Sequence, residues 1–186
     1  ATDSRYIPFT QQNSCCIPTS ISMVMYKLGL PLLPQELLGH HMGLVVNKKD
    51  QHLFWNARTG VKPSAGYGTR LDKKQHEMNS VFKKLKIPIS ATVYPIHNFK
   101  NKNEIINFIY SRVTKNKDLI VFLRSGVLNN NGKRNGHACV IDRIYPTKDI
   151  IRLIDPSSKQ AKYRNFKIDK FIKAIKLHPT NKGRFV

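Results

Sequence analysis

The first clear periodicity in the chain lies within residues 14–28. Apolar side chains recur there with the spacing of one face of a helix, at Ile17, Ile21, Val24, Met25 and Leu28. Pro18 is compatible with a first helical turn, and Gly29 is typical of a helix end. The pattern therefore predicts a helix over residues 14–28 with a buried apolar face.

The middle of the chain, residues 47–68, has no regular period and is expected to form an irregular loop. Trp55 and Tyr67 in this loop are either core residues or aromatic contacts for a substrate. Shorter helical patterns flank it and follow it along the chain. These further helices are expected over residues 34–38 with Gly39 as the end, from a cap at Thr69 or Asp72 to Leu85, from a cap at Asn103 to Val113, and over residues 169–177.

Apolar and β-branched runs predict strands in the second half of the chain. They lie at residues 90–94, 119–124, 137–145 and 150–155, and residues 163–168 are a candidate edge strand. Residues 146–149 read as a hairpin turn, and the polar loop 129–136 directly precedes His137. Helices come first and an antiparallel sheet second, so the fold class is α+β, in a single domain over residues 1–186.

The net charge of the chain is strongly positive and bears on the kind of partner it binds. Lys and Arg number 32 against 11 Asp and Glu, which gives a formal net charge of +21. Such a field attracts polyanions, including nucleic acid, anionic lipid or cell-wall surfaces and acidic proteins. The basic residues are spread from Lys27 to Arg184, so a solvated basic surface explains the composition as well as a specific anionic partner does. No apolar run reaches the roughly 20 residues that span a bilayer, and no transmembrane segment is expected.

The chain has three cysteines, at Cys15, Cys16 and Cys139, too few for a disulfide scaffold. Neighbouring Cys15 and Cys16 would form only a strained bond with each other, so a free thiol is expected. Cys16 falls at the start of the first helix, where the positive end of the helix dipole stabilises a thiolate. Cys139 is expected in the core, with a role as a resolving thiol for Cys16 left open.

Four kinds of side chain needed for thiol catalysis occur in the chain. Cys16 offers the nucleophile, His137 opens a predicted strand, and Asp155 closes the next one. A thiolate mechanism needs a base that shares the thiol proton and a group that orients this base. It also needs donors for the oxyanion, which Gln11 or Gln12 could supply with the backbone N–H of Cys16.

The order of these motifs carries a family resemblance. An upstream side-chain amide is followed by Cys-x-Pro-Thr-Ser at residues 16–20, Gly-His-Ala-x-Val-Ile at residues 136–141, and Asp-Pro at residues 155–156. This order resembles the papain-like cysteine peptidases, and within them the C39-like group of bacteriocin-leader peptidase domains and their stand-alone relatives. The motif resemblance covers about residues 5–30 and 119–160.

The resemblance implies a papain-like fold, with N-terminal helices packed on a C-terminal antiparallel sheet and the site in the cleft between them. Carried over, Cys16 is the nucleophile, His137 the base, Asp155 the orienting carboxylate and Gln11 the oxyanion donor. No metal or other cofactor is implied. The glutamine spacing fits Gln11 slightly better than Gln12, and the choice stays open.

Two departures from the family pattern affect the nucleophile. The family commonly has Gly after it, whereas this chain has Ile17, which adds bulk to the cleft floor. Cys15 beside it makes two thiols available, although the alignment of the motif favours Cys16.

The bacteriocin peptidases are fused to a transporter. Because neither membrane helices nor a phosphate-binding loop is visible here, leader processing coupled to export is not expected.

The simplest hairpin register leaves His137 and Asp155 apart. If Tyr145 pairs with Ile150, the two are displaced by three residues, about 10 Å along a strand. A bulge, another turn register or a diagonal contact must close this distance.

The leading hypothesis is a cysteine peptidase or related acyl-transfer hydrolase acting on a peptide or isopeptide bond, with an acidic or surface-associated substrate. The alternatives are a catalytically silent polyanion- or nucleic-acid-binding module on the same scaffold, and an effector or toxin domain delivered to another cell. Nucleic acid is disfavoured because no recognised binding motif is present. A zinc site from His40, His41 and the paired cysteines matches no known ligand spacing. The chain starts at Ala1, which is compatible with processing and export, and the compartment stays open.

Overall fold

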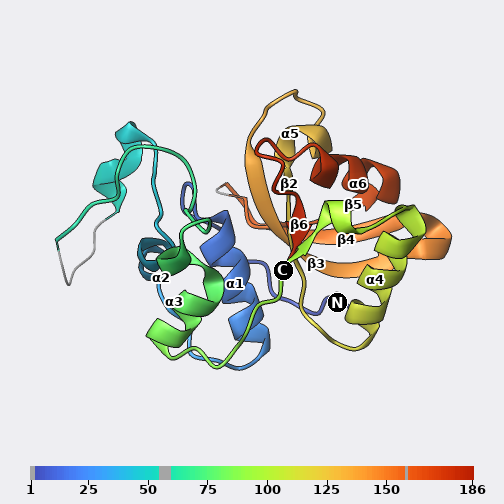
Figure 1. Cartoon of the computed structure of the whole chain (residues 1–186), viewed down its shortest axis with the longest axis horizontal. Helices are drawn as coiled ribbons and strands as arrows, with labels where there is room; N and C mark the ends of the chain where they lie inside the picture. Colours follow the sequence, from blue (N-terminus) through green and yellow to red (C-terminus); the bar gives the residue numbers. More distant parts are fainter. Residues whose placement is uncertain (1–2, 55–59, 158) are drawn as a thin grey trace.

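The computed structural model describes residues 3–54, 60–157 and 159–186 (Figure 1). Helices and short 3-10 turns dominate the first half of the chain, and most of the sheet lies in the second half. The α-helices are α1 (Cys16–Lys27), α2 (Gln35–His41), α3 (Met78–Leu85), α4 (Lys102–Thr114), α5 (Ser125–Leu128) and α6 (Ile168–Lys176). The strands are β1 (Tyr94–Pro95), β2 (Ile120–Arg124), β3 (Gly136–Tyr145), β4 (Ile150–Asp155), β5 (Lys162–Lys167) and β6 (Arg184–Phe185). The predicted α+β class is therefore confirmed.

The six strands form one antiparallel sheet in the order β1-β6-β2-β3-β4-β5. Alternate side chains along β2 and β3 enter two different cores. Val121 and Cys139 belong to the core that α4 and α6 cover, whereas Phe122 and Ala138 belong to the core that α1 and α3 cover. Figure 1 shows these helical layers on opposite sides of the sheet. The sheet is thus the wall against which α1 is positioned.

Helix α1 confirms the strongest sequence prediction. It runs from Cys16 to Lys27 and is buried along most of its length. Within it, the hydroxyl of Thr19 donates to the carbonyl of Cys15 at 2.7 Å. At its other end, Lys27 Nζ lies 2.6 Å from Asp118 Oδ1, just before β2. The helix is therefore held at both ends and presents its first residue, Cys16, at a fixed place.

The β3–β4 hairpin contains a bulge that changes its register. Tyr145 pairs with Ile150, as expected, but the register shifts between Ile141 and Arg143. Beyond this bulge Val140 pairs with Ile154, so Asp155 is moved one residue closer to the start of β3. Continuing the register places Asp155 opposite Cys139, on the same face as His137 and diagonal to it. The bulge and the diagonal contact together close the expected displacement.

Some predicted boundaries were wrong. The second helix continues past Gly39 to His41, because Gly39 is needed for close packing and not as a helix end: a Cβ there would lie 2.8 Å from Leu44 Cδ2. The third helix begins only at Met78. Residues 69–72 instead form loop contacts, with the Arg70 N–H donating to the carbonyl of Met42 at 2.9 Å.

Other differences concern short elements. The expected strand over residues 90–94 is reduced to Tyr94–Pro95. The cap of α4 is Asn101, two residues before the expected one. Helix α5 and strand β6 have no periodic sequence signal, since each has four residues or fewer. Trp55 lies outside the described residues.

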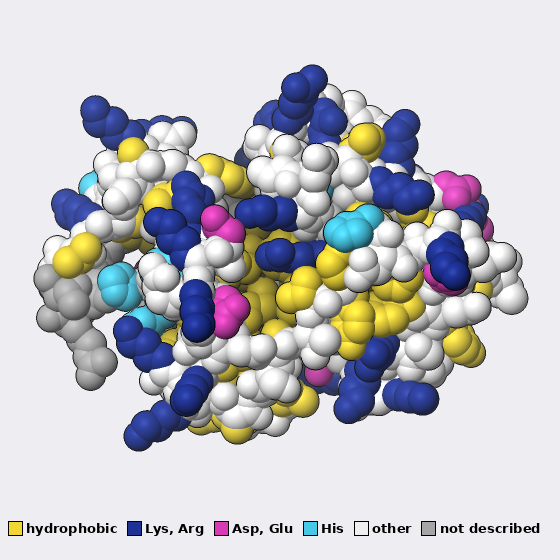
Figure 2. Space-filling model, viewed as in Figure 1, with side chains coloured by type: hydrophobic (Ala, Val, Ile, Leu, Met, Phe, Trp, Pro, Cys, Tyr) yellow, Lys and Arg dark blue, Asp and Glu magenta, His cyan; other side chains and the backbone are white. Residues whose placement is uncertain are grey.

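Basic side chains cover the surface widely. Figure 2 shows Lys and Arg scattered across this face, with far fewer Asp and Glu. In the part of the chain that the structure describes, no helix is both long and apolar enough to cross a membrane.

Candidate active site

Cys16 is the first residue of α1, and 7% of its surface is exposed. It lines a cleft of about 530 Å³ together with His137, Ile17 and Tyr67. A cleft of this size can hold a few residues of a peptide. Ile17, which stands where a glycine was expected, also lines the cleft.

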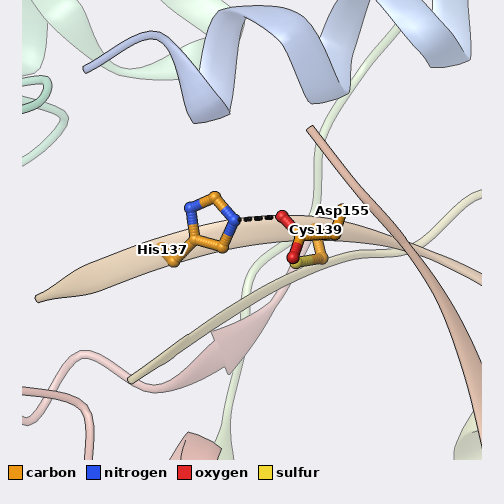
Figure 3. Close-up of side chains that lie close together, drawn as sticks. All are labelled: His137, Cys139 and Asp155. Carbon is orange, nitrogen blue, oxygen red and sulfur yellow. Dashed lines mark hydrogen bonds and ion pairs between the residues drawn. The ribbon is translucent and has the colours of Figure 1, made fainter. Parts of the chain in front are cut away.

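His137 and Asp155 form a direct pair. His137 Nε2 lies 2.7 Å from Asp155 Oδ1, with the two side chains 13% and 10% exposed (Figure 3). They come from adjacent strands, β3 and β4. Because Nε2 faces the carboxylate, Nδ1 is the ring nitrogen left for another partner.

The second oxygen of Asp155 is bound by a residue that sequence reasoning missed. Arg164 Nη1, on β5, lies 2.8 Å from Asp155 Oδ2. Burial alone would raise the pKa of Asp155, but hydrogen bonds and charges from His137 and Arg164 outweigh burial and lower it to about 2. Asp155 is therefore a carboxylate throughout the neutral range.

The pKa of His137 is raised well above its ordinary value. Burial opposes the charged ring, but the hydrogen bond with the ionised Asp155 and the neighbouring sulfur of Cys16 favour it and outweigh that effect. The environment thus stabilises an imidazolium between a thiol and a carboxylate. This is the electrostatic arrangement that a thiolate–imidazolium pair requires.

The other two thiols are in different surroundings. Cys15 is 0% exposed and packs with Leu44, Val46 and Phe54. Burial, followed by the neighbouring Cys16 and by Glu36, raises its pKa to about 12. Burial also raises the pKa of Cys139. Both are protonated at neutral pH and poor nucleophiles, which favours Cys16 as the reactive thiol.

The two candidate glutamines differ in their contacts. Gln12 Nε2 donates to Glu36 Oε1 at 2.6 Å, so its amide is turned toward α2. Gln11 lines a smaller cavity of about 240 Å³ with His137 and Asp155, and its Oε1 is buried without a hydrogen-bond partner in the described chain. Tyr67 and His137 border both this cavity and the main cleft.

One group of side chains has the atoms of a metal site. The donor atoms of His137, Cys139 and Asp155 lie within 4.8 Å of one another. However, Nε2 and Oδ1 already share a hydrogen bond, Oδ2 binds Arg164, and a metal would require the Cys139 thiolate that burial disfavours. The residues therefore fit a hydrogen-bonded pair better than a ligand set. Among the described residues, no group of metal-binding side chains includes His40 or His41.

Three more residues line the cleft. His178 and Arg184, from the last stretch of the chain, had no sequence signal as site residues, whereas Tyr67 was one of two aromatic candidates in the irregular loop. Burial, with the charges of Arg184 and Lys182, lowers the pKa of His178 to about 4, so its ring is neutral at neutral pH. Although 52% of Tyr67 is exposed, desolvation of its hydroxyl and the nearby Cys16 raise its pKa, so it remains a hydrogen-bond donor.

An antiparallel sheet covered by helices, with a thiol at the start of one helix and a His–Asp pair on adjacent strands, defines the papain-like class of α+β folds. The chain belongs to the Peptidase_C39 like family, whose family model matches residues 4–177. No curated protein matches the sequence. Membership in this family indicates a cysteine peptidase at the level of the family.

Proposed function

We propose that this chain is a cysteine peptidase in which Cys16 is the nucleophile, His137 the general acid and base, and Asp155 the carboxylate that orients His137. The hydrolysed bond is a peptide or isopeptide bond. The observation that carries the proposal is the 2.7 Å contact between His137 Nε2 and Asp155 Oδ1, in a ring that also lines the cleft of Cys16.

In the first half of the reaction, the Cys16 proton moves to His137 Nδ1, and the thiolate attacks the substrate carbonyl carbon. A carbon–sulfur bond forms, and the carbonyl electron pair moves onto oxygen. The backbone N–H of Cys16 and the side-chain amide of Gln11 are the proposed donors to this oxyanion. His137 then gives its proton to the amine nitrogen as the carbon–nitrogen bond breaks.

In the second half, water attacks the thioester while His137 accepts one of its protons. The carbon–sulfur bond breaks, the carboxylic acid product leaves and the Cys16 thiol is restored. Asp155 keeps the ring in the tautomer and orientation that both steps need, and stabilises the imidazolium formed in each. Gln11 is preferred to Gln12 because Gln12 is hydrogen-bonded to Glu36.

The proposal is tested with a pair of neighbouring cysteine variants. Cys16→Ala should abolish cleavage of a mixture of synthetic peptides followed by mass spectrometry, whereas Cys15→Ala should retain it within a few-fold. At pH 6, iodoacetamide should alkylate Cys16 faster than it alkylates the thiol of free glutathione. Cys15 should remain unmodified. Equal activity of wild type and Cys16→Ala, or a Cys16 no more reactive than glutathione, would contradict the proposal.

A further inference from the structure

The cleft beside Cys16 is strongly cationic. Four basic residues line it, at Arg70, Arg134, Lys182 and Arg184, whereas Asp72 is the sole carboxylate among its described lining residues. The neutral ring of His178 does not offset this balance. A low-dielectric cleft with one sign of charge concentrates ligands of the opposite sign. The cleft is therefore suited to a substrate with negative charge.

Arg184 is held by stacking on an aromatic ring. It lies on β6 directly across from Phe122 of β2. Its guanidinium carbon sits 4.7 Å from the centre of the Phe122 ring. Stacking on an aromatic ring fixes the plane of the guanidinium, in which its N–H donors lie. The side chain is therefore oriented before any ligand arrives.

The guanidinium of Arg184 is also incompletely satisfied. Its Nε is buried without a hydrogen-bond partner, and Arg184 forms no ion pair with any carboxylate in the described residues. Burial lowers the pKa of Arg184, and the negative charge of Asp72 offsets only part of this lowering. A partly buried, unpaired cation is costly, and a carboxylate from a ligand would remove that cost.

The strand order places Arg184 within reach of the reaction. β2 lies between β6 and β3, so the backbone of Arg184 is two strand spacings, about 10 Å, from that of His137. Both residues line the same cleft as Cys16. An acidic side chain one or two residues from the reacting carbonyl could reach Arg184 while the carbonyl lies at Cys16.

We infer that Arg184 is a specificity residue that selects an Asp or Glu side chain of the peptide close to the bond cleaved at Cys16. This inference rests on the proposed peptidase function. The carboxylate oxygens would accept hydrogen bonds from the stacked guanidinium, and the surrounding cations would steer acidic peptides into the cleft.

The test compares cleavage sites in a mixture of unmodified synthetic peptides, mapped by mass spectrometry. Wild type should cut preferentially where Asp or Glu occupies one fixed position near the bond. Arg184→Gln should reduce cleavage at these sites at least tenfold and change cleavage at neutral sites less than threefold. Arg184→Glu should shift the preference toward Lys or Arg at that position. Lys115→Gln, an exposed cation at the end of α4 outside the cleft, should leave the profile unchanged.

A second measurement does not need a known substrate. Iodoacetate and iodoacetamide both alkylate a thiolate by displacing iodide, but only iodoacetate carries a carboxylate. The rate of alkylation by iodoacetate, divided by the rate with iodoacetamide, should be higher for Cys16 than for free glutathione. This ratio at Cys16 should fall with added NaCl. It should drop at least threefold in Arg184→Gln. The iodoacetamide rate reports whether the variant is folded around Cys16.

The two proposals fail in different ways. Cleavage without a preference for Asp or Glu, or a preference that survives Arg184→Gln, overturns the role of Arg184 and leaves the peptidase intact. Absence of cleavage, together with a Cys16 that reacts with iodoacetamide no faster than glutathione, overturns the peptidase and the inference with it.

Discussion

The carboxylate of Asp155 is buried between two cationic partners, and this sets the properties of His137. Oδ1 binds His137 Nε2 at 2.7 Å and Oδ2 binds Arg164 Nη1 at 2.8 Å. A carboxylate bound to His137 alone would stabilise the imidazolium more strongly. By taking part of the negative charge, Arg164 limits this effect and keeps Asp155 ionised. The pair is thus balanced for a ring that must both hold and release a proton.

Replacing Asp155 with Asn should lower kcat/KM for peptide cleavage by on the order of a hundredfold or more, because the His137 tautomer is no longer fixed.

The Asp155→Asn variant should also be less stable at neutral pH. Asp155 has a folded pKa of about 2, against an ordinary value of 3.8, so its stabilisation is present above pH 4 and lost as pH falls toward 2. That difference corresponds to about 2 kcal/mol.

Urea unfolding of wild type and Asp155→Asn at several pH values measures this effect. The difference between them should be largest between about pH 4 and 6, where Asp155 is ionised and His137 is charged, and should shrink as the pH falls from 4 to 2. Asp169→Asn serves as a control, because Asp169 pairs with Lys102 at the surface, where its side chain is 73% exposed. A pH-independent difference for Asp155→Asn would contradict the proposed ion pair.

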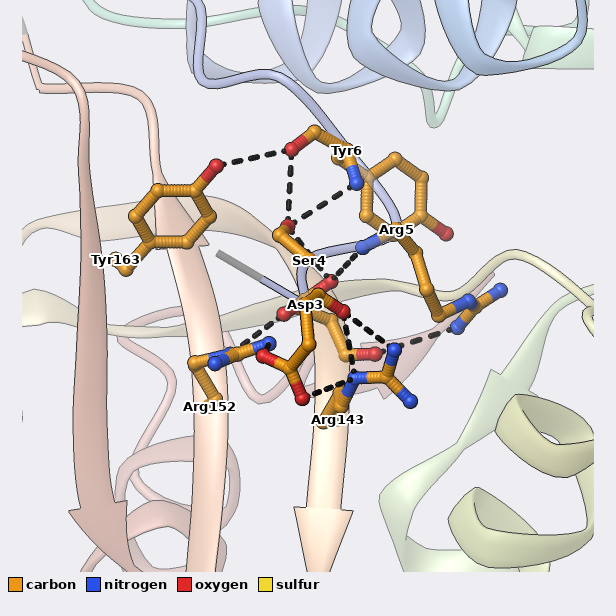
Figure 4. A network of polar contacts seen from close by, with 8 residues as sticks. Asp3, Ser4, Arg5, Tyr6, Arg143, Arg152 and Tyr163 are labelled. Carbon is orange, nitrogen blue, oxygen red and sulfur yellow. Dashed lines mark hydrogen bonds and ion pairs between the residues drawn. The ribbon is translucent and has the colours of Figure 1, made fainter. Parts of the chain in front are cut away.

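At the scale of elements, the bulge in β3 links the site to the start of the chain. Asp142, at the bulge, is 0% exposed. Its Oδ1 accepts from the Arg5 backbone N–H at 2.8 Å and from the Ser4 hydroxyl at 3.0 Å, and its Oδ2 from Arg152 Nε at 2.6 Å. Figure 4 shows Ser4, Arg5 and Arg152 gathered around this network. Tyr163 of β5 donates to the Tyr6 carbonyl at 3.1 Å. The carboxylate of Asp142 therefore stabilises the bulged register of the β3–β4 hairpin and also holds the segment that leads to α1 against it.

Asp142→Ala should destabilise the protein by about 3 kcal/mol, because it leaves Arg152 and the Arg5 backbone N–H with fewer partners. Amide hydrogen exchange should show faster exchange at Arg5 and Tyr6, and in the residues flanking the bulge. Peptide cleavage should fall even where the protein remains folded, since the bulge brings Asp155 toward His137. Asp169→Asn again provides the surface control. Unchanged exchange at residues 4–6 would show that the network does not hold this segment.

The elements also show what the sequence could and could not predict. Helix α1, the β3–β4 hairpin and its turn follow from local periodicity, and with them the approximate places of Cys16, His137 and Asp155. The bulge at Asp142 and the contacts of Arg164 and Arg184 depend on strand order and register, which local patterns do not contain. Gly39 was misread because its reason, close packing against Leu44, is a tertiary contact. The assignment of residues 1–186 to one domain stays a prediction.

At the scale of the whole molecule, the positive charge has two separate consequences. Lys and Arg outnumber Asp and Glu by 32 to 11, so most cations have no carboxylate available to them. Within the cleft this excess is the basis of the proposed selection of acidic peptides. Over the rest of the surface it produces self-repulsion, which destabilises the folded state and is reduced by salt. Screening should therefore weaken selection of acidic peptides while it stabilises the fold.

This opposition can be measured on one sample. Between 20 and 300 mM NaCl the Debye length falls from about 20 to 6 Å, so repulsion between separated surface cations is largely removed. The Tm should rise by a few degrees over this range, whereas the preference for Asp- or Glu-containing peptides should fall. Choline chloride at equal ionic strength should act alike, because screening depends on ionic strength and not on the cation. A Tm that falls with both salts would mean that local ion pairs, such as Lys27 with Asp118 and Arg164 with Asp155, outweigh the net repulsion.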